Sequence, residues 1–406
     1  MPSPQYDVVL YGATGFTGRH AAAHMERFAP DGVRWALAGR SREKLEALAQ
    51  GFKRHAGIIV ADSSDPPSVD AMVASTRVLL STAGPFALYG EPVIAACARS
   101  GVDYVDITGE VPFLRRMIDR YHQRAVDSRA RIIPCCGFDS IPSDLGTLML
   151  VQALRHAGQG CAEVKAFFLG KGGFSGGSLA TALHIAGEED EALVKDPFLL
   201  NPRDTRPPDD PKNADLDRAI LDPDLGGWAG PFFMAPVNTR VVRRSAALAQ
   251  QYGNPYGGDF RYWEAMGPLS QFMARGLSGG IRLMTTMGRL RWARELAARF
   301  APAPGEGPSD KVMDAGFMRV RLFARGTSGL ELEGELFSEG DPAIRVTVKM
   351  VCESALALVL DRARLPGGST RGGVLTPATG LGLVVVDRLR AAGIRMETRP
   401  RRQALR

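Results

Sequence analysis

Three glycines at three-residue spacing follow an apolar run near the start of the chain. Tyr6–Tyr11 is rich in strand-forming residues, and Gly12, Gly15 and Gly18 come directly after it, ahead of a predicted helix. In such a turn the first glycine permits the bend, the second lets backbone N–H groups approach a pyrophosphate, and the third allows close helix–strand packing. Because a helix N-terminus attracts phosphates, the pattern predicts a dinucleotide-binding loop. The expected cofactor contacts from this loop are Gly12, Thr14, Gly15, Phe16, Thr17 and Gly18.

The residues after the second apolar run indicate which dinucleotide binds. A NAD site places an acidic residue about 20 residues beyond the glycines, where it binds the ribose 2′-hydroxyl. Here Arg40 and Ser41 occupy that place. Arginine is a permanently charged, planar donor that suits a 2′-phosphate, so the sequence favours NADP(H). The alternative is that Arg40 merely belongs to a solvated helix start, together with Arg42 and Lys44.

Short apolar strands alternate with helical stretches up to about residue 145. This alternation predicts a doubly wound parallel sheet of the Rossmann type, with its ligands beyond the carboxyl ends of the strands. By that rule Asp62, after the third strand, is expected near the adenine. Ala83, Gly84 and Pro85, after the fourth strand, are expected to contact the cofactor. The loops at 108–110 and 137–140 are further candidates, and backbone N–H groups near Gly84 and Gly137 are candidates to stabilise developing negative charge.

The rhythm changes after residue 141. Strands are predicted at 163–169, 318–324, 330–337 and 344–349, residues 195–260 read as irregular, and helices are predicted at 351–361 and 378–392. We therefore expect an α/β chain with an inserted α+β domain that contains antiparallel strands. The expected boundaries are 1–145 for dinucleotide binding, 146–373 for substrate or partner binding, and 374–406 for a C-terminal helix that returns to the first domain.

Several residues are candidates for a catalytic role. Gly173–Gly177 matches the Gly-x-Ser-x-Gly elbow of serine hydrolases, but no histidine follows His184 to complete a triad, so a glycine-lined cavity wall is favoured. No Tyr-x-x-x-Lys pair occurs. Tyr89, Asp139 and Ser140 remain as candidate proton donors, with His184 as a further one. The alternative for Asp139 and Ser140 is that they cap a helix beginning near Pro142.

Residues 265–300 combine apolar residues with six arginines and a single acid, Glu295. One interpretation is a core helix pair with a solvated arginine face. The other is a basic amphipathic surface for a membrane interface, an acyl chain or an acidic carrier protein.

Composition bounds the remaining possibilities. The 406 residues suffice for two domains, and 45% hydrophobic with 23% charged residues is ordinary for a globular enzyme. The net charge of +6 comes without an aromatic-interleaved basic motif, so no nucleic-acid partner is expected. The five cysteines lack metal-ligand spacing, so no metal is expected. Without a signal peptide or an apolar run of about 18 residues, we expect a cytoplasmic protein, with a peripheral contact at the inner membrane face through 265–300.

Four segments resemble the saccharopine dehydrogenase-like oxidoreductases: 9–18, 37–40, Ala83-Gly84-Pro85-Phe86 with Tyr89-Gly90, and Tyr104-Val105-Asp106 with Thr108-Gly109-Glu110. Within that group, 137–146 and 375–379 resemble the bacterial trans-acting enoyl reductases. The resemblance implies a stand-alone partner of polyketide synthases in lipid synthesis, which reduces an enoyl thioester with NADPH. It is specific in the first 146 and last 30 residues and loose between about 195 and 310.

One departure bears on the substrate. Saccharopine reductases carry an Asp-Pro-Gly loop after the sixth strand, whereas this chain has Asp139-Ser140-Ile141-Pro142. The departure disfavours an amino-acid substrate. Two alternatives stay open: an imine or amino-acid dehydrogenase closer to saccharopine chemistry, and a non-catalytic NADPH-binding protein at lipid surfaces. An anionic pocket lined by Ser, Thr or Arg would favour the former, and an apolar tunnel favours the enoyl reductase.

Overall fold

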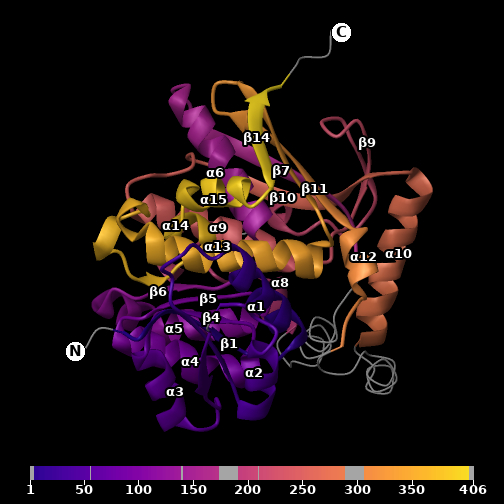
Figure 1. Cartoon of the computed structure of the whole chain (residues 1–406). Helices are drawn as coiled ribbons and strands as arrows, with labels where there is room; N and C mark the ends of the chain where they lie inside the picture. The colour runs from indigo at the N-terminus through magenta and orange to yellow at the C-terminus, as the bar shows by residue number, and fades with distance from the viewer. Residues whose placement is uncertain are drawn as a thin grey trace.

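The alternation of strands and helices in the first third of the chain builds an all-parallel sheet (Figure 1). This computed structural model describes residues 4–54, 56–138, 140–172, 191–208, 210–288 and 306–401. The strands of the first sheet, in spatial order, are β13 (Gly373–Val374), β6 (Arg131–Ile133), β5 (Asp103–Asp106), β4 (Thr76–Ser81), β1 (Tyr6–Tyr11), β2 (Trp35–Gly39) and β3 (Gly57–Val60). The order β3-β2-β1-β4-β5-β6 is that of the doubly wound dinucleotide-binding fold. The predicted Rossmann-type sheet is confirmed.

Helices cover both faces of this sheet, as its continuous apolar strands require. Val8 and Leu10 of β1 point into one buried cluster, whereas Val9 and Tyr11 point into another. The first cluster is closed by α1 (Phe16–Phe28), α2 (Arg42–Ala49) and α13 (Thr347–Leu360). The second is closed by α3 (Pro66–Ala74), α4 (Phe86–Ser100) and α5 (Val111–Ser128). A helix from the last sixth of the chain therefore completes the packing of the first sheet.

The second sheet is mixed, and the predicted antiparallel component is confirmed. Only β7 and β10 pair in parallel within it; its other pairs are antiparallel. Its strands, in spatial order, are β14 (Arg395–Pro400), β12 (Glu331–Glu339), β11 (Phe317–Gly326), β7 (Cys161–Lys171), β10 (Arg261–Leu269), β9 (Gly227–Gly230) and β8 (Ile220–Asp222). A tight turn at 326–329 joins β11 to β12 as a hairpin, with Gly329 at a φ of +89°.

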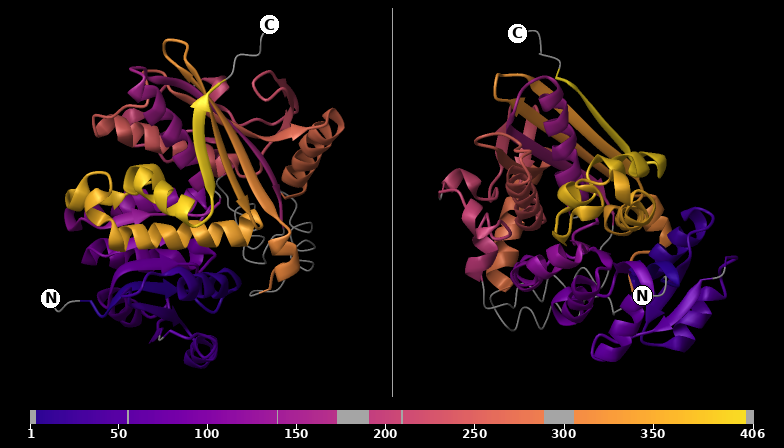
Figure 2. Two further views of the ribbon diagram at one scale, coloured as in Figure 1. Left: turned by 45° about the horizontal axis from the view of Figure 1, so that its top comes forward. Right: turned by 90° about the vertical axis from the view of Figure 1, so that its left-hand side faces the viewer.

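The remaining helices lie around the second sheet: α6 (Ile141–His156), α8 (Glu191–Lys195), α9 (Ala235–Gln251), α10 (Gln271–Gly288), α12 (Asp310–Asp314), α14 (Pro377–Gly380) and α15 (Leu383–Ala391). Figure 2 shows the C-terminal helices between the two sheets, where α13 packs on the first sheet and α15 packs on α13. α6 covers the face of the second sheet formed by β7, β11 and β12. Single turns are η1 (Arg203–Thr205), η2 (Pro211–Asn213), η3 (Pro342–Val346, a π turn), η4 (Arg362–Arg364) and η5 (Gly368–Thr370).

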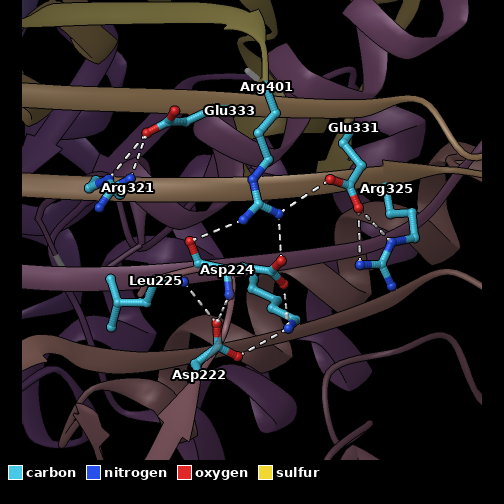
Figure 3. Close-up of polar contacts among 9 residues, drawn as sticks. Asp222, Asp224, Leu225, Arg321, Arg325, Glu331, Glu333 and Arg401 are labelled. Atoms are coloured by element: carbon cyan, nitrogen blue, oxygen red, sulfur yellow. Dashed lines mark hydrogen bonds and ion pairs between the residues drawn. The ribbon is translucent and has the colours of Figure 1, made fainter. Parts of the chain in front are cut away.

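A charged network covers part of the second sheet and binds the end of the chain to it (Figure 3). Lys165 Nζ lies 3.0 Å from Asp222 and 2.6 Å from Asp224. Burial opposes the charge of Lys165, but the hydrogen bonds that Lys165 donates to Asp224 and Asp222 outweigh it and raise its pKa. Arg401 reaches Asp224 at 2.5 Å and Glu331 at 3.3 Å. The network therefore joins the β8–β9 turn, β7, β12 and the C-terminal segment.

Three local predictions are wrong. Residues 344–349 are not a strand but part of η3 and α13, because the Asp341 carboxylate accepts hydrogen bonds from the N–H groups of Ile344 (3.1 Å) and Arg345 (3.0 Å) and starts the helix. Residues 195–260 contain α9, whose buried valines follow helical spacing. The helix predicted at 378–392 breaks at Gly382, whose φ is +62°.

The chain beyond residue 373 contributes to both sheets. β13 pairs with β6 of the first sheet, and β14 pairs with β12 of the second. The domain division at 145/146 and 373/374 stays a prediction. A fragment cut at either boundary would lose a strand or helix that packs on the other side of the cut.

Candidate functional site

The glycine loop after β1 has no room for side chains. Gly12 has a φ of +83°, and a Cβ built on it would lie 2.8 Å from the backbone nitrogen of Ala83. A Cβ on Gly18 would lie 2.1 Å from the carbonyl oxygen of Gly12. The first and third glycines therefore let β1, the loop after β4 and α1 approach within van der Waals contact, as a pyrophosphate-binding turn requires.

The start of α1 supplies the positive end of the loop. Gly15 is the N-cap of α1, and the first intrahelical bond runs from the N–H of Arg19 to the carbonyl of Gly15 at 2.9 Å. The N–H groups of Phe16, Thr17 and Gly18 precede that bond in the first turn, where backbone donors have no intrahelical acceptor. The helix dipole adds to their attraction for an anion. This cradle fits the pyrophosphate of a dinucleotide.

Three predicted residues meet at the ends of β2 and β3. Arg40 is exposed directly after β2, and Ser41 is the N-cap of α2, where its hydroxyl accepts a hydrogen bond from the N–H of Lys44 at 3.3 Å. Asp62 follows β3. Hydrogen bonds from the backbone and hydroxyl of Ser64, together with the nearby charge of Arg40, lower the pKa of the Asp62 carboxyl. The structure therefore brings Arg40, Ser41 and Asp62 to one edge of the sheet.

Arg40→Glu is expected to reverse the preference for NADPH over NADH. The substitution removes the donor for a 2′-phosphate and adds a second carboxylate beside Asp62, which would repel the phosphate. The Kd ratio for the two nucleotides, measured by fluorescence titration, should change by roughly 100-fold or more. Arg42→Glu, at the first residue of α2, is the charge-matched control and should leave the preference near that of the parent. An unchanged preference in Arg40→Glu would refute the assignment.

The loop after β4 is held from two sides. The N–H of Thr82 donates to the carbonyl of Tyr11 at 2.9 Å, and its hydroxyl reaches the same carbonyl at 3.2 Å. Beyond Ala83, Gly84 and Pro85, α4 begins at Phe86. The Glu110 carboxylate accepts hydrogen bonds from the N–H groups of Phe86 and Ala87, both at 2.7 Å. Glu110 therefore occupies the N-terminus of α4 and fixes the path of residues 83–85.

A second buried carboxylate joins the ends of β5 and β6. Asp106 accepts hydrogen bonds from the N–H of Thr108 (3.0 Å), the N–H of Cys135 (3.1 Å) and the hydroxyl of Tyr104 (2.8 Å). Burial raises the pKa of Asp106 to about 7 against these hydrogen bonds. The segment from Tyr104 to Glu110 thus aligns three strand ends with each other, a role that its spacing alone did not reveal.

The three candidate proton donors have different surroundings. Tyr89 lies in the first turns of α4 and is 38% exposed. Ser140 is fully buried, and its hydroxyl donates to the side-chain oxygen of Asn238 at 3.1 Å. Asp139 lies outside the described residues, as do Gly173–Gly177 and His184. Of the two described candidates, Tyr89 is the exposed one.

Ser140 belongs to a buried polar network that the sequence did not reveal. Asn238 of α9 donates to Glu264 of β10 at 2.8 Å. Glu264 also accepts hydrogen bonds from the hydroxyls of Ser143 and Tyr262, each at 2.7 Å. Burial raises the pKa of Glu264 to about 7. The network ties the start of α6 to the second sheet.

A cluster of three aromatic rings, the aromatic wall, lies at the loop that follows β6. It consists of Phe138, Phe168 of β7 and Phe232. The rings of Phe168 and Phe232 stack at 4.4 Å, and Phe138 meets Phe168 edge-on at 5.9 Å. The Phe138 N–H donates to the hydroxyl of Thr347 at 3.0 Å, and Met234 Cε would lie 3.5 Å from a Cβ on Gly109. Phe168 and Phe232 are buried, whereas Phe138 is half-buried, so Phe138 is the member of the wall that leaves apolar surface at the carboxyl edge of the first sheet.

Three buried arginines of α9 are engaged with the protein itself. Arg240 binds Asp215 and backbone carbonyls. Arg243 donates to three carbonyls, and Arg244 donates to the carbonyls of Leu200 (2.5 Å) and Val374 (2.6 Å). Burial lowers the pKa of Arg244 to about 9. These guanidinium groups hold loops and strand β13 in place.

In the described part of the chain, no cluster of three or more His, Cys, Asp or Glu side chains has a metal-binding arrangement. None of the helices in the same residues has the length and apolar character needed to span a bilayer.

The chain is similar in sequence and in fold to known oxidoreductases. Residues 8–133 match the family described as saccharopine dehydrogenase NADP binding domain. A Mycobacterium tuberculosis protein is 40% identical over 97% of both chains, and a trans-acting enoyl reductase of Mycobacterium bovis is 39% identical over 97% of this chain and 98% of its own. The apo saccharopine dehydrogenase (L-Glu forming) of Saccharomyces cerevisiae has the same fold, with a TM-score of 0.55 and 14% identity over 98% of this chain and 100% of its own.

Proposed function

The chain belongs to the trans-acting enoyl reductase group of the saccharopine dehydrogenase-like oxidoreductases, and on this premise we propose that it reduces the carbon–carbon double bond of an enoyl thioester with NADPH. It is an NADP-dependent oxidoreductase. The proposed substrate is a lipid-like acyl thioester, and the proposed partner is an acyl carrier or polyketide synthase that presents it.

The aromatic wall is the observation that carries this proposal. The half-buried Phe138 offers apolar surface, backed by the buried rings of Phe168 and Phe232, beside the loops where a doubly wound sheet binds the reactive end of its cofactor. An acyl chain gains free energy from such a surface, whereas the carboxylates and ammonium of an amino-acid substrate need charged partners. The buried arginines of α9, which would otherwise suit a carboxylate, are bound to carbonyls and Asp215.

Each predicted contact has a role in holding the cofactor. The first turn of α1 and the glycine loop would bind the pyrophosphate, Arg40 and Ser41 the 2′-phosphate, and Asp62 the adenine end. Ala83, Gly84 and Pro85 would flank the nicotinamide ring. NADPH, when bound, supplies the hydride.

The protein's own part is orientation, exclusion of water and proton delivery. The aromatic wall would keep water from the reacting carbons, and the backbone N–H of Gly137 would stabilise a developing thioester enolate. The N–H of Gly84 does not share this role, because it donates to the carbonyl of Thr82 at 3.1 Å, and the N–H groups of Phe86 and Ala87 donate to Glu110. Tyr89 is the described candidate best placed to return a proton. Ser140 supports the site through Asn238 and Glu264, and Asp139 stays a candidate.

We expect NADPH consumption with enoyl thioesters and none with an imine formed from an amine and a 2-oxo acid. Phe138→Ala should raise KM for long-chain substrates more than for short-chain ones, because Phe138, which packs on Phe168 of β7, is the half-buried ring of the wall and its loss removes apolar contact area. Phe167→Ala is the matched control, since Phe167 points to the opposite face of β7, against Trp263 and Phe323. Turnover of the imine alone would favour the saccharopine-like alternative, and NADPH binding without any turnover would favour a non-catalytic protein.

A further inference from the structure

Helix α10 stands at the β8–β9 edge of the second sheet, next to β9 (Figures 1 and 2), and one of its faces packs on that strand. Ala274, Leu277 and Ser278 form that face. A Cβ on Gly230 of β9 would lie 3.2 Å from a methyl group of Leu277 and 3.3 Å from the carbonyl of Ala274. Within the described part of the chain, the packed face of α10 is therefore the one turned toward β9.

The face of α10 opposite β9 is apolar and exposed. Phe272 is 86% exposed, Leu283 60%, Met273 57% and Met287 36%. At 100° per residue these four side chains fall in a single sector, away from the packed face. Gly276, Gly279 and Gly280 lie among them, and a Cβ on any of these glycines would meet nothing within 4 Å. The side chains thus project from an open, convex surface rather than lining a groove.

An arginine cluster borders this apolar face. Arg218, Arg275 and Arg282 line a shallow groove of about 430 Å³ together with Trp228. Arg275 lies over the Trp228 ring at 5.7 Å, and Arg282 meets Asp217 at 3.6 Å on the exposed surface. The 18 residues of α10 include no aspartate or glutamate. The groove and the helix are therefore net basic.

We propose that α10 docks on an anionic lipid surface. Large apolar side chains projecting from a convex helix face are suited to the acyl boundary of a bilayer, and flanking arginines are suited to its phosphates. A protein partner would be expected to meet a groove into which its own side chains fit, and the glycines of the outer face provide no such groove. The inference is independent of the proposed reaction, because it concerns where the enzyme sits and not what it reduces.

Flotation with vesicles tests this inference on the full chain. The parent should float with vesicles of phosphatidylcholine that contain about 30 mol% phosphatidylglycerol, and much less with phosphatidylcholine alone. Phe272→Ser with Leu283→Ser, and separately Arg275→Glu with Arg282→Glu, should each lower the bound fraction roughly tenfold or more. NADPH binding should be unchanged in both variants, which shows that they are folded.

Matched controls separate the surface from general polarity and charge. Val126→Ser with Leu360→Ser changes two exposed apolar residues elsewhere, and Arg124→Glu with Arg203→Glu makes the same change in net charge on other elements. Both controls should float like the parent. A parent that stays unbound with anionic vesicles, or α10 variants that float as well as the parent, would overturn the inference.

Discussion

Gly18→Ala is expected to abolish NADPH binding at concentrations that saturate the parent. The new methyl group would lie 2.1 Å from the carbonyl oxygen of Gly12 and 2.9 Å from the backbone of Ala13. Both neighbours are backbone atoms, so α1 itself must move away from β1. Overpacking of this kind costs about 3 kcal/mol, which corresponds to roughly 100-fold in Kd if it falls on the binding-competent loop.

Two further alanine variants should have smaller effects on NADPH binding and serve as controls. Gly15→Ala places its Cβ 3.3 Å from the Gly12 carbonyl, a contact that needs only a small shift, so its Kd should rise far less. Gly51→Ala, in the same domain, meets only the Leu48 carbonyl at 3.6 Å and should bind NADPH like the parent. Equal affinities for the parent and Gly18→Ala would show that the loop does not hold the pyrophosphate.

Glu110→Ala is expected to lower both the stability of the protein and its turnover. Two backbone N–H groups at the start of α4 would lose a charged acceptor, at a cost of about 1–3 kcal/mol each when buried. The free energy of unfolding, measured by urea titration, should therefore fall by about 3 kcal/mol. Residues 83–85 would also lose their fixed path. We therefore expect kcat per folded molecule to fall, in addition to the loss of folded protein.

Glu91→Ala on the same helix is the control for Glu110. Glu91 pairs with Arg120 at 2.5 Å and with Tyr121 at the surface, where ion pairs contribute about 1 kcal/mol or less. Its unfolding midpoint and turnover should stay close to those of the parent. If Glu110→Ala behaved like Glu91→Ala, the role of Glu110 in positioning the loop after β4 would be refuted.

The cofactor half of the site was predictable because its signals are local. The glycines, the strand before them and the helix after them lie within about 20 residues, and short-range sterics dictate each step. Arg40 is predicted from its distance beyond the glycines and Asp62 from its place at a strand end, and their contacts with the cofactor stay predictions. The same rule nominated residues 108–110, although the capping of α4 by Glu110 depends on an N–H 24 residues away.

The substrate half depends on contacts that no local pattern encodes. Ser140 reads as a helix cap or proton donor, yet its hydroxyl partner, Asn238, is 98 residues away. Phe168 and Phe232 meet only because β7 and the start of α9 pack together. Helix α9 was missed because proline, glycine and aspartate dominate the residues before it, and residues 344–349 were assigned to a strand because an apolar–polar alternation also fits the start of a helix.

Transfer of label from NADPH deuterated at C4 of the nicotinamide to an enoyl thioester tests the central claim most directly. Mass spectrometry of the saturated product should find a single deuterium at the β-carbon, with the α-hydrogen drawn from solvent. An unlabelled product, or deuterium at the α-carbon, would contradict the account, as would a complete lack of turnover with NADPH bound.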